Sequence, residues 1–173
     1  DFADINVSGS KSTIGFGSLE KRVSERNRTD NVFFDISSSM ELGKFFPQKT
    51  GIKIPMFVSY SSQVSTPQYD PKTPDIELKN ALDNASKSEK KAILEYAQDY
   101  TTRNSINFTN VRKERTNPEK KPQVWDVENF NVSYAYTKLA HRDFINERNT
   151  QETYRGSLAY NYSGQSKTVE PFA

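Results

Sequence analysis

The clearest alternation of apolar and polar side chains lies between Val32 and Leu42, and only Ser38 interrupts its apolar side. A period of two predicts a β-strand with one apolar and one polar face. The run is longer than the ~5–6 residues usual in soluble strands and matches the ~9–11 residues of a tilted membrane strand. We expect its apolar side to meet lipid. That side carries Val32, Phe34, Ile36, Met40 and Leu42, and the polar side carries Asp35, Ser37, Ser39 and Glu41.

Further segments show the same period and predict five more strands. Pro47–Gly51 is a short turn, which makes the strand after it the hairpin partner of the Val32–Leu42 strand. Pro55 has no N–H for a ladder, so we expect a bulge or a free edge there. An extra residue between Phe108 and Val111 predicts a second bulge. The five strands are expected within Ala3–Gly9, Ile52–Ser61, Ile106–Val111, Phe130–Tyr136 and Tyr154–Tyr162.

Two long connections separate these strands. Lys11–Asn31 is polar, and the glycines within Ile14–Leu19 suit a turn better than a phosphate-binding loop. Gln63–Asn104 begins rich in proline and then turns helical. Its main helix is predicted by the capping-box pair Ser86 and Glu89 and by apolar residues at helical spacing as far as Tyr100, and a shorter helix precedes it. The apolar residues of the two helices are Ile76, Leu78, Leu82, Ala92, Ile93, Tyr96, Ala97 and Tyr100.

Composition agrees with an all-β fold that carries a short helical insertion. Aromatic residues make up 12% of the 173 residues, and Ser, Thr and Asn are frequent. We divide the chain into strands at 1–62, a Pro-rich and helical excursion at 63–104, and strands at 105–173. No apolar run is long enough for a transmembrane helix, but alternating barrel strands need no such run. Because the sequence opens in a strand pattern and stops as if another segment followed, we expect an internal fragment of a larger protein.

The sequence supplies no constellation for catalysis, a cofactor or a metal, and we expect no enzyme. His141 is predicted to lie in a loop without a second His or any Cys. Asp70 and Asp75 lack the spacing of a calcium loop. Lys and Arg number 24 against 22 Asp and Glu, a balance that speaks against a nucleic-acid partner.

The tyrosines of the last strands admit two interpretations. They would cover the half-buried sheet of a soluble β-sandwich, or they would form the aromatic girdle of a membrane barrel near the strand ends. The residues alone leave this choice open, and strand length favours the barrel. The tyrosines concerned are Tyr134, Tyr136, Tyr154, Tyr160 and Tyr162.

Several strings, taken in order, resemble the SprA/Sov family, the outer-membrane translocon of the type IX secretion system. None is a mechanistic motif by itself, so the specificity comes from their shared order. The resemblance covers most of Val32 to Phe172. The strings are Glu41–Pro47, Ile54–Met56, Tyr60-Ser61, Pro67–Pro71, Pro74-Asp75, Ala97–Thr101, Asn107–Lys113, Tyr154–Gly156 and Ala159–Tyr162.

The resemblance implies a segment of a very large antiparallel barrel in the outer membrane of a Gram-negative bacterium. Such a barrel conducts secreted cargo proteins and gliding adhesins. Its implied partners are outer-membrane lipid, the remainder of the barrel, a PorV-type protein, a periplasmic plug and the cargo.

Two alternatives remain open at this point. A soluble β-sandwich surface-binding module requires the apolar faces to converge on one core. Another outer-membrane barrel, such as a TonB-dependent transporter, is distinguished by a plug domain that this stretch lacks. For any barrel, short turns are periplasmic and long loops extracellular. With Pro47–Gly51 as the shortest connection, the excursion Gln63–Asn104, Lys11–Asn31 and the connection around His141 are expected on the extracellular side.

Overall fold

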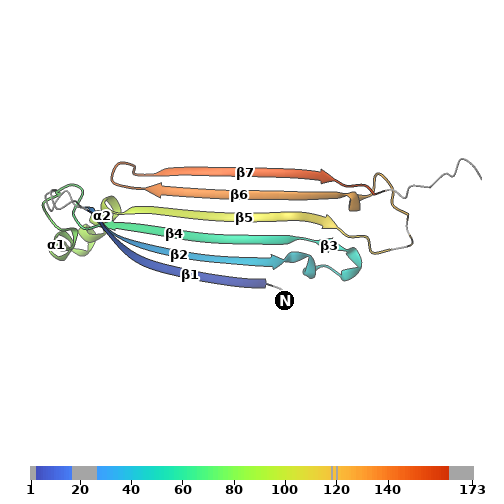
Figure 1. The fold of residues 1–173 in the computed structure, drawn as a ribbon, viewed down its shortest axis with the longest axis horizontal. Helices are drawn as coiled ribbons and strands as arrows, with labels where there is room; N and C mark the ends of the chain where they lie inside the picture. The colour runs from blue at the N-terminus through green and yellow to red at the C-terminus, as the bar shows by residue number, and fades with distance from the viewer. Residues whose placement is uncertain (1–2, 17–26, 118, 120, 164–173) are drawn as a thin grey trace, which may run out of the picture.

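A computed structural model of the chain describes residues 3–16, 27–117, 119 and 121–163 (Figure 1). They form one seven-stranded antiparallel sheet in the order β1-β2-β4-β5-β6-β7, with short β3 paired to β5 beside this path. The strands are β1 (Ala3–Phe16), β2 (Asn27–Glu41), β3 (Ile52–Lys53), β4 (Pro55–Pro67), β5 (Asp99–Lys113), β6 (Phe130–Arg142) and β7 (Asn149–Tyr160). The all-β fold is confirmed.

The predicted helical insertion is also confirmed, as α1 (Leu78–Asp83) and α2 (Lys87–Ala97) between β4 and β5. The capping box of α2 is present: the Ser86 backbone N–H donates to the Glu89 carboxylate at 2.8 Å, and the Ser86 side chain accepts from the Glu89 backbone. Short 3-10 helices occur at η2 (Leu42–Phe45), η3 (Gln48–Thr50) and η4 (Val127–Asn129).

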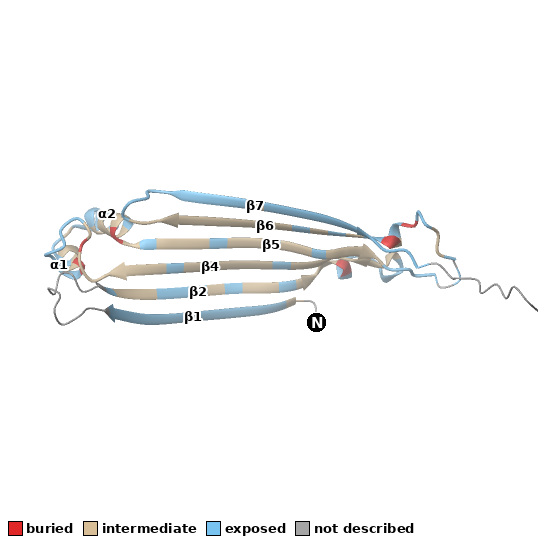
Figure 2. Ribbon diagram, turned by 45° about the horizontal axis from the view of Figure 1, so that its top comes forward, coloured by how far each residue is buried: buried red, intermediate tan, exposed pale blue. Residues whose placement is uncertain are grey.

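Almost nothing along the strands is buried. Among the described residues, the only buried apolar ones are Leu78, with 2% of its surface exposed, and Ala97, with 4%. Both belong to the helical insertion. Figure 2 accordingly shows buried residues at the ends of the sheet and none along the strands. The sheet is a single layer, and the described residues cover neither of its faces.

Strand boundaries differ from the prediction wherever both faces of a strand are polar. The predicted connection Lys11–Asn31 is wrong at both ends, because β1 continues to Phe16 and β2 begins at Asn27. The excursion Gln63–Asn104 is likewise shorter, spanning only 68–98. Polar residues on both faces remove the alternation from the sequence, but backbone pairing continues through them. Part of the turn predicted at Ile14–Leu19, residues 17–19, lies outside the described residues.

Three single-residue assignments are also corrected. Tyr100 follows the helical spacing but lies in β5, because α2 ends at Ala97. Leu42 follows the β2 alternation but lies in η2, where the chain has already turned. His141, predicted in a loop, lies in β6 opposite Thr101.

The hairpin of β2 and β4 is confirmed, and Pro55 marks an irregularity at the end where the connection 42–54 joins the two strands. Pro55 is the first residue of β4 and pairs with Glu41, while pairing of β4 to β5 begins one residue later. The Glu41 carboxylate accepts the Ile54 N–H at 2.6 Å and the Gly43 N–H at 3.0 Å. These two bonds satisfy backbone donors where the ladder is interrupted.

The second predicted bulge is present in β5. The register of β5 against β6 shifts between Phe108 and Val111. Asn110 has the left-handed φ of 58°, and its N–H donates to the Ser133 hydroxyl at 2.8 Å.

The described connections divide between the two ends of the sheet (Figure 1). The helical end carries connections 68–98 and 143–148, and the β3 end carries 42–54 and 114–129. Pro47–Gly51 is therefore not the shortest connection, because η2, β3 and η3 lengthen it and the β6–β7 turn is shorter. Loop length at that position alone does not orient the sheet.

We predict that the 173-residue chain expressed alone aggregates or stays partly unfolded. In the described part of the chain, the edge strands β1 and β7 each pair on one side, one face of the sheet is apolar and uncovered, and Leu78 and Ala97 are the only buried apolar residues. Sedimentation velocity and amide dispersion in detergent-free buffer test this. A monomer that melts cooperatively with dispersed amide signals would contradict it.

Candidate functional site

The two faces of the sheet are its candidate functional surfaces, and the strand register defines them. Directly paired residues of antiparallel strands project to the same side. Ile36 pairs with Val7 on β1 and with Tyr60 on β4. The same row continues through Asn104, Lys138 and Glu152. Starting from Ile36, the register therefore assigns each paired residue of every strand to one of the two sides of the sheet.

One side, here named the apolar face, collects the large apolar residues of all six long strands. Many of them are solvent-exposed in the described chain, including Ile5 at 71% and Leu158 at 67%. Its residues include Ile5, Val7, Val32, Phe34, Ile36, Met40, Met56, Val58, Tyr60, Ile106, Phe108, Val111, Phe130, Val132, Tyr134, Tyr136, Tyr154, Leu158 and Tyr160.

The other side, here named the polar face, carries mainly small hydroxyl and amide side chains. It also carries charged residues, and its large apolar exceptions are Ile14, Phe33, Phe57 and Leu139. Its residues include Asp4, Asn6, Ser8, Asp35, Ser37, Ser39, Ser59, Ser61, Gln63, Ser65, Thr101, Arg103, Ser105, Asn107, Ser133, Thr137, Thr153, Arg155 and Ser157.

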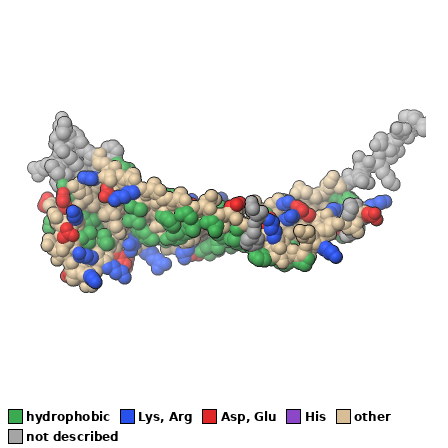
Figure 3. Space-filling model, turned by 90° about the horizontal axis from the view of Figure 1, so that it is seen from below, with side chains coloured by type: hydrophobic (Ala, Val, Ile, Leu, Met, Phe, Trp, Pro, Cys, Tyr) green, Lys and Arg blue, Asp and Glu red, His purple; other side chains and the backbone are tan. Residues whose placement is uncertain are grey.

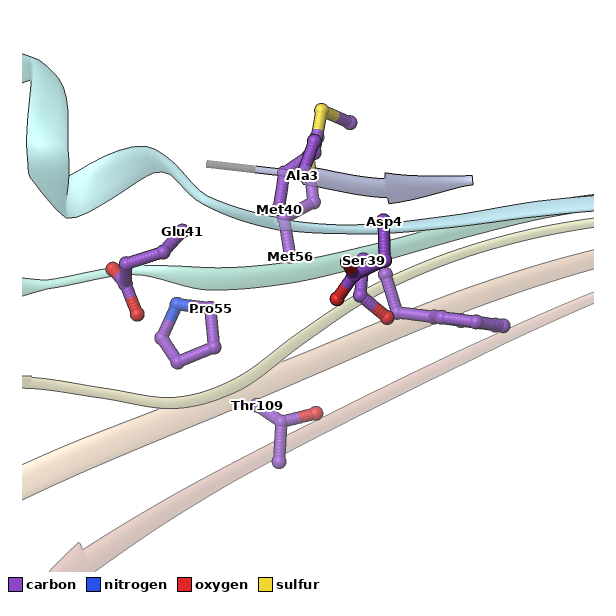
Figure 4. Close-up of a pocket in the computed structure, with 9 residues that line it drawn as sticks. Ala3, Asp4, Ser39, Met40, Glu41, Pro55, Met56 and Thr109 are labelled. Carbon is purple, nitrogen blue, oxygen red and sulfur yellow. The ribbon is translucent and has the colours of Figure 1, made fainter. Parts of the chain in front are cut away.

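The separation of the faces is visible at the residue level near the β3 end (Figure 4). Met40 and Ser39, neighbours on β2, project to opposite sides of the strand there. A shallow cavity of about 300 Å³ lies here, and Asp4, Ser39 and Thr109 are among its lining residues. It opens at the sheet margin and gathers no acid, base and nucleophile around one point.

The apolar residues form a band that does not reach the helical end. On β6 and β7 the band ends at Tyr136 and Tyr154, whose ring centroids lie 4.9 Å apart. The next row toward the helical end is charged, with Lys138 Nζ 2.8 Å from the Glu152 carboxylate. Figure 3 shows hydrophobic side chains along the middle of the sheet and charged ones mostly toward its two ends.

The helical insertion lies on the side of the apolar face, beyond this band. The Gln98 side chain donates to the Thr66 hydroxyl at 2.9 Å, and Arg142 lies 3.5 Å from Glu95. Thr66 and Arg142 both belong to apolar-face positions by register. Asp70, the buried carboxylate of the insertion, accepts from the Tyr96 hydroxyl at 3.0 Å and anchors the turn before α1.

His141 has partners that the sequence did not reveal. Its Nδ1 lies 2.9 Å from the Thr101 hydroxyl and 3.3 Å from Asp99, and its Nε2 lies 3.0 Å from Asp143. The backbone N–H of Asn146 is the main cause that holds the pKa of the Asp143 carboxyl below its ordinary range, and the bond from His141 adds to it. In the sequence, the only signal for this cluster is that His141 and Asp143 lie two residues apart.

This cluster has the hydroxyl, imidazole and carboxylate order of a hydrolase triad. Its surroundings instead favour a structural role, in which its hydrogen bonds join β5 to β6 and to the turn that follows β6. β5 lies between β4 and β6, so the backbone N–H groups beside Thr101 serve the two ladders instead of an oxyanion. Asp143 is bound by the turn that follows it. Asp70, Asp75, Glu147 and Glu152 do not join the cluster, and the described residues include no group of three metal-ligating side chains.

No helix in the described part of the chain is both long and apolar enough to cross a membrane. No curated protein matches the chain. Residues 1–82 match the family model SprA_N, described as a motility related/secretion protein. The strings between Glu41 and Asp75 fall within the matched residues, and those from Ala97 onward lie beyond them. The match confirms the resemblance that the motifs indicate: over residues 1–82 the chain is similar to a motility related/secretion protein, which supports an SprA/Sov-family fragment.

Proposed function

We propose that this sheet is part of the wall of an outer-membrane β-barrel that conducts secreted proteins. In this proposal the apolar face meets lipid and the polar face lines the aqueous pore. The match to a motility related/secretion protein supports the secretory role. The partners implied by the resemblance belong to the same proposal: a PorV-type protein, a periplasmic plug, the rest of the barrel and the cargo.

The observation that carries the proposal is the separation of most large apolar side chains from most small polar ones across a single-layer sheet. Barrel strands alternate lipid-facing apolar residues with lumen-facing polar ones. A soluble sheet instead buries its apolar face against a second layer, and the described residues provide none over the strands. The small hydroxyl groups of the polar face give a hydrated wall with few large apolar side chains to retain a passing polypeptide.

Between β2 and β6 the end of the apolar band is displaced along the strands, as expected of tilted barrel strands, although on β1 the band stops at Val7, in the row of Ile36. A membrane plane crosses neighbouring strands at displaced positions when they tilt by about 35–45°. On β6 the band stops at Tyr136, but on β2 it continues to Val32. Val32 lies in the row that passes through Tyr100 to Arg142, farther toward the helical end.

The β-sandwich alternative is less well supported. It needs strands of ordinary length and a partner sheet, whereas the long strands here run up to 15 residues in β2 and β5. The family match favours a secretion protein over a TonB-dependent transporter. The proposed role is conduction and carries no catalytic step.

The orientation of the sheet follows from its helical end. There the strands extend past the apolar band, and the connection 68–98, longest among the described ones, folds into helices. Barrels place their longer loops outside the cell. We therefore propose that the helical end is extracellular and the β3 end periplasmic.

Replacing Ile106 with Arg in the intact protein is expected to cost ~2–4 kcal/mol of folding free energy in bilayers, the cost of a lipid-facing cation near the midplane. Ile106 pairs with Val58 and Tyr136 on the apolar face. The matched variant Ser105→Arg projects into the pore and is expected to cost far less. Urea unfolding from vesicles measures both, and equal costs would refute the assigned facing.

Cysteine at the exposed position Lys91 on α2 is expected to react with a membrane-impermeant maleimide on whole cells. Cysteine at the exposed position Gln48 on η3 is expected to react only after the outer membrane is permeabilised. The chain contains no native cysteine to interfere. The reverse labelling pattern would invert the orientation.

A further inference from the structure

The connection between β5 and β6 contains a small rigid loop built on buried polar side chains. Asp126 and Asn129 are both buried. The Asp126 carboxylate accepts the Gln123 N–H at 2.8 Å, and the Asn129 amide donates to the carbonyls of Gln123 and Val124 at 2.7 and 3.1 Å. Arg115 lies 3.2 Å from Asp126 and donates to Asn129 at 3.0 Å.

This polar interior displays three apolar side chains outward: Val124, Trp125 and Val127, here named the tip. Trp125 is 76% exposed and is the single tryptophan of the chain. Val124 and Val127 are also exposed. A loop held by buried polar groups with apolar residues outside reverses the arrangement of an ordinary solvated loop. The exposed apolar side chains of the tip are suited to contact with an apolar environment.

The tip adjoins the apolar face at the β3 end. The Tyr160 hydroxyl donates to the Val124 carbonyl at 2.8 Å. The Tyr160 ring packs against Phe130, with centroids 5.0 Å apart. Both rings belong to the apolar face. The tip therefore extends that face beyond the ends of the strands.

We propose that the tip is a membrane-interface anchor, in which Trp125 and its two valines insert among the lipid headgroups at the β3 end of the sheet. This inference rests on the proposed barrel wall. Indole is favoured at membrane interfaces because its ring is apolar and its N–H stays hydrated. Lipid is the occupant because the tip is continuous with the face proposed to meet lipid.

The charged residues around the tip are compatible with a position among the lipid headgroups. Lys113 pairs with Glu128 at 2.9 Å, and Arg115 pairs with Asp126. Asp126 and Glu128 stand next to the tip residues in the sequence, and both are paired with a cation, so neither brings an isolated charge to the bilayer interface. The anchor would hold the wall at a set height in the bilayer.

A nitroxide depth measurement on the intact protein in phospholipid vesicles tests the anchor. Spin labels are placed on cysteine introduced at Val124 in the tip, Leu158 on the apolar face, Ser157 on the polar face and Gln48 as an aqueous site at the same end. Relaxation by oxygen, which prefers lipid, is compared with relaxation by a water-soluble nickel chelate. The Val124 label is expected between the Leu158 and Gln48 values, and Trp125→Ser should shift it toward Gln48 while Trp125→Tyr retains its depth.

The outcomes separate the anchor from the barrel wall. A Val124 label as aqueous as Gln48, with Leu158 in lipid, overturns the anchor and leaves the wall intact. A Val124 label shielded from both relaxants shows a protein partner over the tip and also overturns the anchor. If the Leu158 label is aqueous, the apolar face does not meet lipid. That result contradicts the proposed barrel wall, and with it the anchor that rests on that proposal.

Discussion

Strand register is the constraint on which the rest of the structure depends. Side chains alternate along each strand, so a slip by one residue would move a whole apolar set to the other side. Across six long strands the register keeps these sets together. The bulge in β5 serves the same end: Val111 lies three residues after Phe108, so a regular strand would place it on the polar face, and the bulge returns it to the apolar face. Backbone pairing thus creates two chemically distinct surfaces without any buried sheet core.

A single-layer sheet with one apolar face depends for its stability on the lipid or protein that covers that face. Burial of apolar area normally supplies most of the driving force for folding, but among the described residues Leu78 and Ala97 of the helical insertion are the only buried apolar ones. Ladder hydrogen bonds hold the strands to one another, and the apolar face requires lipid or further protein. The same surface that we expect to destabilise the isolated sheet in water is the one that we propose meets lipid. The polar face needs only water, which the lumen of the proposed pore would provide.

Much of the fold could be predicted where apolar and aromatic residues alternate clearly, as in Val32–Met40 and Phe130–Tyr136. Prediction failed where both faces of a strand are polar, as after Lys11 and around His141, because pairing there is dictated by the neighbouring strand. The apolar and polar sides of β2 could be predicted from its alternation. That the apolar face continues across all the strands could be established only from the strand register. The tip was missed because Val124, Trp125 and Val127 follow no period, and a lone Trp in a polar loop was its only signal.

Alternation of solvent access along one strand tests the central claim most directly. In the intact protein in native membranes, cysteines placed singly from Asn131 to Tyr136 on β6 report the two faces in turn. After permeabilisation, a water-soluble maleimide is expected to react at positions 131, 133 and 135 on the polar face and to spare 132, 134 and 136 on the apolar face. Equal reactivity at all six positions, or reaction only on the apolar face, would contradict a wall between lipid and an aqueous pore.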